Sequence, residues 1–243
     1  MDWALAISRN REALERILAA LFSLVGLEND QSAMASGRWG STQAADCRIL
    51  LPRHLHAHVL RILRAAESAI RRLVVIAARD VAVKLRPGGE GLRRDFGWKG
   101  QDEASPVAIR IPAFALLDPL KKYPFEPPRR ASKFTPRICV VGFTEPAPVP
   151  QKPVLSPDDP VDAAGLCRRL LASRRALENL PAQARRLARW QARNKLRSGP
   201  GRVVPLRFGA PPGKRKRPIH AVDAVLKECH ALALDVLSPP DTS

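Results

Sequence analysis

The stretch 51–85, LPRHLHAHVLRILRAAESAIRRLVVIAARDVAVKL, has the strongest helical pattern in the chain. One apolar stripe follows strict four-three spacing: Leu55, Val59, Ile62, Ala66, Ala69, Leu73 and Ile76. A second stripe lies beside it: Leu60, Leu63, Ile70, Val74 and Val81. Because a stripe this wide needs more than one packing neighbour, the pattern favours a bundle within the chain over a free coiled coil. It predicts a helix over 51–85 that stops at Pro87, Gly88 and Gly89, with Arg71 and Arg72 on the remaining surface.

Two shorter segments repeat this spacing nearer the ends of the chain. Residues 3–27 read as a helix with Asp2 as its N-cap, and residues 218–237 read as the last helix. We expect 3–27 and 51–85 to form an antiparallel pair. Aromatic residues make up only 5% of the chain, so the core should consist mostly of Leu, Ala, Val and Ile.

A fourth helical segment covers 160–197, and Pro181 interrupts it. Proline breaks the hydrogen-bond ladder of a helix without moving the apolar stripe, so we expect a kink or two helices that meet nearly end to end. Asp158 or Asp159 is the expected cap at its start.

The middle of the chain differs in composition from both ends. Residues 86–160 hold 14 of the 23 prolines. Two short runs, 107–111 and 138–143, have strand-like patterns, and 144–160 reads as a proline-rich linker. The sequence therefore predicts a mainly α fold: a bundle of four to five helices with a Pro-rich middle segment and a small β element. The expected division is 1–86 (helical pair), 87–156 (middle segment) and 157–243 (basic helical region).

Positive charge is concentrated in one part of the chain. Residues 163–218 contain sixteen Lys or Arg residues and one acid, Glu178, whereas the whole 243-residue chain has a net charge of +18. A local excess of this size suggests a surface that meets an anionic partner, most commonly nucleic acid.

Within this segment, arginines recur every four residues, so they share one broad face while Leu187 points the opposite way. A second cluster follows in the stretch GKRKRP. Guanidinium groups suit phosphate oxygens because they bind them in a bidentate manner. The predicted nucleic-acid-binding residues are Arg185, Arg186, Arg189, Arg193, Arg197, Lys214, Arg215, Lys216 and Arg217.

The leading hypothesis is a non-enzymatic protein that binds nucleic acid mainly through phosphates. With only Trp190 and Phe208 as aromatics in this region, base stacking is disfavoured. The alternative is a helical scaffold that binds an acidic protein partner. An anionic membrane surface and a merely solvated basic face also remain open.

No motif predicts a catalytic residue, a cofactor or a metal. His54, His56 and His58 alternate, but the histidine pattern of metal hydrolases is absent, and the first turn of a helix explains them. Cys229 lies on the apolar stripe of the last helix and is expected in the core. The four cysteines form no CxxC pair, which favours a reduced, cytoplasmic setting. The longest apolar run, 17–27, is about half of what a bilayer crossing needs.

The C-terminal third resembles a family of conserved bacterial proteins with no assigned activity. The matching stretches are LARWQAR (187–193), PLR (205–207), PPG (211–213), HAVDAVLKECHALALDVL (220–237) and the closing SPPDTS (238–243). The resemblance implies a bacterial source and brings no functional residue with it.

Overall fold

The computed structural model describes residues 2–27, 49–83, 112–120, 155–196 and 202–237. Within these ranges the fold is mainly α, with a two-stranded antiparallel sheet, as the sequence predicted. The elements in chain order are α1 (Trp3–Val25), β1 (Leu50–Pro52), α3 (Arg53–Ala77), β2 (Pro160–Asp162), α4 (Ala164–Glu178), α5 (Leu180–Lys195) and α6 (Ala221–Leu237). The strands predicted at 107–111 and 138–143 and the residue Arg197 lie outside the described part of the chain.

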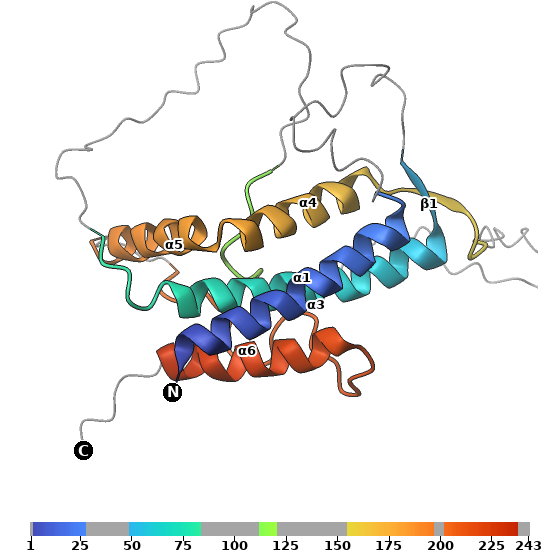
Figure 1. The fold of residues 1–243 in the computed structure, drawn as a ribbon. Helices are drawn as coiled ribbons and strands as arrows, with labels where there is room; N and C mark the ends of the chain where they lie inside the picture. Colours follow the sequence, from blue (N-terminus) through green and yellow to red (C-terminus); the bar gives the residue numbers. More distant parts are fainter. Residues whose placement is uncertain (1, 28–48, 84–111, 121–154, 197–201, 238–243) are drawn as a thin grey trace, which may run out of the picture.

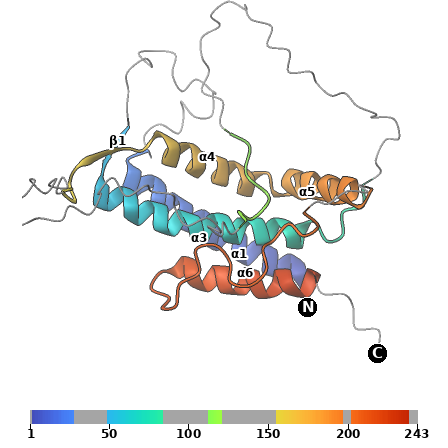
Figure 2. The same cartoon turned by 180° about the vertical axis from the view of Figure 1, so that it is seen from behind.

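The helices stack in three layers (Figure 1). The antiparallel pair α1 and α3 forms the middle layer, α4 and α5 cover one side of it, and α6 covers the other. The view from behind shows the same order (Figure 2). Residues 202–220 connect the two outer layers, because they lead from the end of α5 to the start of α6.

Helix α1 begins and ends close to the predicted positions. The Asp2 carboxylate accepts a hydrogen bond from the Leu5 N–H at 3.1 Å and thereby caps the first turn. At the other end Gly26 adopts φ = 75°, a left-handed conformation that glycine reaches without steric cost. The N–H groups of Gly26 and Leu27 then bond the carbonyls of Ser23 and Phe22.

Helix α3 is shorter at both ends than the predicted 51–85. It ends at Ala77, after which the Arg79 guanidinium lies over the Trp3 ring, 4.5 Å from its centroid. Val81 still packs against the core, but in a non-helical backbone. The apolar pattern therefore predicted correctly that Val81 packs against the core. It did not predict that the helix ends before Val81, where Arg79 contacts Trp3 at the start of α1.

The small sheet forms where helix starts were predicted. Leu51 pairs with Val161 and Pro52 pairs with Pro160 in a two-stranded ladder, where a proline without an N–H is tolerated at an edge. The prediction that Asp158 or Asp159 caps a helix is wrong, because α4 begins only at Ala164. The Ala164 N–H instead donates to the Asp162 carboxylate at 2.9 Å.

The long basic segment is two helices, as the proline suggested. Helix α4 ends before Asn179 and α5 starts at Leu180, with Pro181 in its first turn, where no N–H is required. All five helices in the described residues contribute to one buried apolar cluster, so the described parts of 1–86 and 157–243 share a core. The division into three segments stays a prediction.

Candidate nucleic-acid interface

Helix α5 presents its arginines to solvent, as its spacing predicted. Leu187 is 0% exposed and packs inward, whereas Arg185, Arg189 and Arg193 are exposed. These three are called the α5 arginines below. Each successive arginine is about 40° further round the helix, so they form one slowly turning row.

Within the described residues, no carboxylate forms an ion pair with any of the α5 arginines. Arg186 is exposed too, but its Nη1 donates to the Phe114 carbonyl at 2.8 Å. Because this hydrogen bond connects α5 to the segment 112–120, Arg186 is a weaker candidate for ligand contact than its neighbours.

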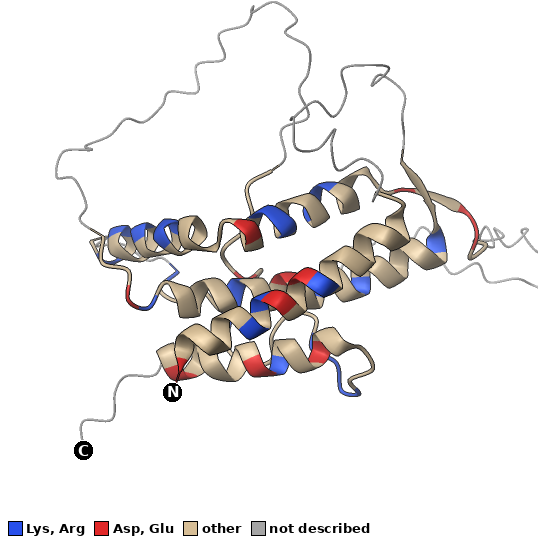
Figure 3. Cartoon of the chain, viewed as in Figure 1, with Lys and Arg blue, Asp and Glu red and all other residues tan. Residues whose placement is uncertain are grey.

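Helix α4 extends the positive layer. Arg168 and Arg175 are exposed and seven residues apart, hence on one face of the helix. Arg169 is bound by Glu67 of α3, with Nε and Oε1 2.9 Å apart, and Arg174 by Glu178 at 3.0 Å. Glu178 is the only acid in α4 and α5. Within the described part of the chain, carboxylates therefore pair with just two of the arginines in this layer, and Figure 3 shows blue segments along both helices.

The second predicted cluster lies in a different layer. Lys214, Arg215, Lys216 and Arg217, the basic loop, precede α6 (Figure 3). Gly213 at its start lies against the backbone of Ala65 in α3. The two clusters, which the sequence predicted together as nucleic-acid-binding residues, therefore lie on opposite sides of the α1–α3 pair.

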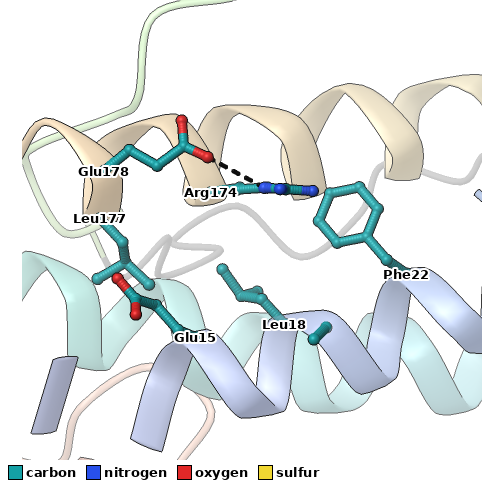
Figure 4. A pocket seen from close by; sticks show the side chains of 7 residues that line it. Glu15, Leu18, Phe22, Arg174, Leu177 and Glu178 are labelled. Atoms are coloured by element: carbon teal, nitrogen blue, oxygen red, sulfur yellow. Dashed lines mark hydrogen bonds and ion pairs between the residues drawn. The ribbon is translucent and has the colours of Figure 1, made fainter. Parts of the chain in front are cut away.

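An apolar pocket of about 360 Å³ lies between α1 and α4 (Figure 4). Leu18, Phe22 and Leu177 line it, and the Arg174 guanidinium lies 5.5 Å from the Phe22 ring centroid. The two carboxylates beside it, those of Glu15 and Glu178, are each paired with an arginine four residues away on their own helix. Because each carboxylate already has a partner on its own helix, the pocket offers no pair of unoccupied acids for acid–base chemistry.

A buried polar cluster that the sequence pattern did not predict lies beneath the positive layer. Arg71 and Arg72, predicted on the surface, are 6% and 0% exposed. Arg72 Nη2 donates to the Asp118 carboxylate at 3.0 Å, and burial lowers the pKa of Arg72 while that carboxylate opposes the shift. Asp118 comes from the Pro-rich middle segment, and a single acid there carries no periodic signal that could have revealed the contact.

Most of the described histidines and cysteines contact other protein groups or lie in the core. The His54 ring lies 3.3 Å from the Asp158 carboxylate, and the His58 ring packs edge-on against His220. No group of three or more metal-ligating side chains occurs among the described residues. Cys229 is 0% exposed, as predicted for a core residue, and burial raises the pKa of its thiol to about 12, so it is a poor nucleophile.

Comparison of the chain with protein-family models, curated proteins and solved structures finds no match. The resemblance of the C-terminal third to a bacterial family therefore stays an expectation. Among the described helices, none is long and apolar enough to cross a bilayer.

Proposed function

We propose that this protein binds nucleic acid through phosphate contacts made by α4 and α5. The observation that carries the proposal is the row of α5 arginines, exposed and without a carboxylate partner in the described part of the chain. Arg168 and Arg175 add two more exposed guanidiniums on α4.

The chemistry of the row favours the backbone of a nucleic acid over its bases. Guanidinium groups bind phosphate oxygens bidentately and stay charged at any physiological pH. The α5 arginines extend over about 12 Å of helix. Each arginine can therefore contact a different phosphate of the same backbone. Trp190 packs partly buried against the core, so it is not a free stacking platform. Phe208 is 85% exposed, but it lies outside α4 and α5. The ligand proposed for these two helices is therefore a duplex or structured RNA, bound with little sequence preference.

A salt series tests the proposal. We expect the full chain to bind a labelled 20-base-pair duplex, with log affinity falling against log salt at a slope of about −5 for six phosphate contacts. The triple variant Arg185→Gln, Arg189→Gln, Arg193→Gln should weaken binding and make this slope shallower by about 3. Fluorescence anisotropy at four or five salt concentrations measures both.

The matched control removes three charges from the basic loop: Lys214→Gln, Lys216→Gln, Arg217→Gln. It lowers the net charge equally, so a specific α5 interface predicts a clearly smaller effect on the slope. Equal effects of the two triples would mean that binding follows net charge and would contradict a specific α5 interface. A flat salt response of the unaltered chain would contradict phosphate-led binding altogether.

The alternative function, binding of an acidic protein, would use the same arginines. The four-three stripes that first suggested a scaffold are largely buried within this chain's own core, which leaves the positive layer as the basis for that alternative. A partner that stays bound after nuclease treatment, and that the α5 triple variant loses, would favour it. A bacterial, cytoplasmic setting is part of the proposal; the two described cysteines, Cys167 and Cys229, are free and buried.

A further inference from the structure

A second group of cations surrounds a cavity in the opposite layer, beside the start of α6. The cavity has a volume of about 280 Å³. Lys214, Arg215 and Lys216 of the basic loop and Lys227 of α6 line it. None of these four forms an ion pair with a carboxylate in the described part of the chain.

The backbone holds the basic loop in place from below. Gly213 has φ = 85° and lies so close to α3 that a β-carbon on it would be 2.8 Å from Ala65 Cα. The Lys214 N–H donates to the Pro211 carbonyl at 3.1 Å, which closes the turn. Buried Leu226 lines the cavity from α6. The cations are therefore brought together by a packed turn.

One carboxylate, that of Asp223, also lines the cavity, and one of its two oxygens is bonded to the backbone. Asp223 Oδ2 accepts hydrogen bonds from the N–H groups of Ile219 and His220, each at 3.1 Å, and so caps the start of α6. Asp223 Oδ1 is buried and has no hydrogen-bond partner among the described residues, so four cations surround one carboxylate that is bonded through Oδ2 alone. The balance favours a ligand with more than one negative charge.

His230 adds a neutral donor to the same cavity. Its Nδ1 accepts a hydrogen bond from Arg72 Nε at 3.2 Å, so the ring proton of the neutral form is on Nε2. Burial lowers the pKa of His230, and the charges of Arg72 and Lys214 lower it further, while Asp118 opposes them. His230 therefore sits in a positive field as a neutral ring.

We propose that this cavity binds the phosphate of a phosphomonoester, such as a nucleoside monophosphate. A phosphomonoester carries a charge of about −1.5 to −2 at neutral pH, which matches several cations better than a singly charged phosphodiester does. The volume is near the lower end of the range for small-molecule pockets. The site does not depend on the nucleic-acid interface of α4 and α5, which lies in the other outer layer.

Calorimetry on the full chain at constant ionic strength tests this site, with adenosine 5′-monophosphate, inorganic phosphate and adenosine as probes. We expect saturable one-to-one binding of the monophosphate and none of adenosine. Inorganic phosphate that binds as tightly as the monophosphate would identify free phosphate as the ligand, and weaker binding would identify a nucleotide. Absence of saturable binding by either phosphate probe overturns the proposal.

The variant Lys216→Gln, Lys227→Gln removes two cations from the cavity wall and should lower affinity for the monophosphate at least tenfold. The matched control Arg189→Gln, Arg193→Gln removes two charges from α5 and should leave that affinity unchanged. Equal losses would mean nonspecific attraction by net charge and would overturn the site. Because the control variant weakens only nucleic-acid binding, failure of one proposal is distinguishable from failure of the other.

An NMR titration of His230 reports where in the protein the anion binds. A bound phosphate dianion stabilises the imidazolium, so the pKa of His230 should rise when inorganic phosphate saturates the site. The Lys216→Gln, Lys227→Gln variant should show no such rise at the same phosphate concentration. An unchanged His230 pKa in the saturated, unaltered protein would place the anion elsewhere.

Discussion

The Asp118 carboxylate accepts hydrogen bonds from Arg71 Nη1 at 3.3 Å, from Arg72 Nη2 at 3.0 Å and from the Arg207 N–H at 3.4 Å. The backbone of Asp118 is engaged as well, since its N–H donates to the Pro205 carbonyl and its carbonyl accepts from Arg202. A single side chain from the middle segment thus connects α3 to the segment that follows α5. Buried charges need this degree of satisfaction because an unpaired one is costly.

Replacing Asp118→Asn should therefore destabilise the fold strongly. The amide keeps the shape of the side chain but leaves the buried Arg72 without a counter-charge, a loss of about 3–5 kcal/mol in the free energy of unfolding. Urea denaturation followed by circular dichroism measures it. As a control, Glu178→Gln breaks an exposed ion pair and should cost at most about 1 kcal/mol. Similar midpoints for the two variants would contradict the central role of Asp118.

Single-residue predictions from the sequence succeeded where the reason was local. The exposure of Arg185, Arg189 and Arg193 follows from their angle to Leu187 on the same helix. The burial of Arg72 depends on Asp118, which is 46 residues away in the chain. No periodicity within α3 could reveal that contact, so the helix pattern alone placed Arg72 on the surface.

At the scale of elements, apolar spacing located every described helix but did not fix every boundary. The start of α1 was predictable because a capping aspartate precedes it. The end of α3 and the strands β1 and β2 were not, because they depend on contacts between segments far apart in sequence. Pro181 marked the α4–α5 junction correctly, since the effect of proline on a helix is purely local.

The turn that precedes the basic loop allows a test of how closely Gly213 packs against α3. At Gly213 a left-handed backbone coincides with a position where a β-carbon would clash with Ala65, whereas Gly209 has φ = 77° and open space around it. Gly209→Ala should cost about 1 kcal/mol for its backbone conformation alone. Gly213→Ala should cost clearly more, because the loop must also move away from α3. Thermal unfolding midpoints compare the two, and equal shifts would contradict the close approach.

At the scale of the whole molecule, the described helices form one packed body with two separate basic regions. The α1–α3 pair separates the layer of α4 and α5 from the basic loop beside α6 (Figure 3). In the sequence both regions belong to one basic segment, 163–218, because they are neighbours in the chain. Their separation follows from residues 202–220, which carry the chain from one outer layer to the other.

One shared core implies one cooperative unfolding transition. Leu73 of α3 and Leu170 of α4 are both fully buried in the common apolar cluster, although the whole middle segment separates them in sequence. Leu73→Ala and Leu170→Ala should each cost about 2–5 kcal/mol. In each variant, circular dichroism and tryptophan fluorescence should report the same lowered midpoint, since a two-state unit unfolds as a whole. A variant that shifts only part of the transition would show that 1–86 and 157–243 unfold separately in spite of their shared core.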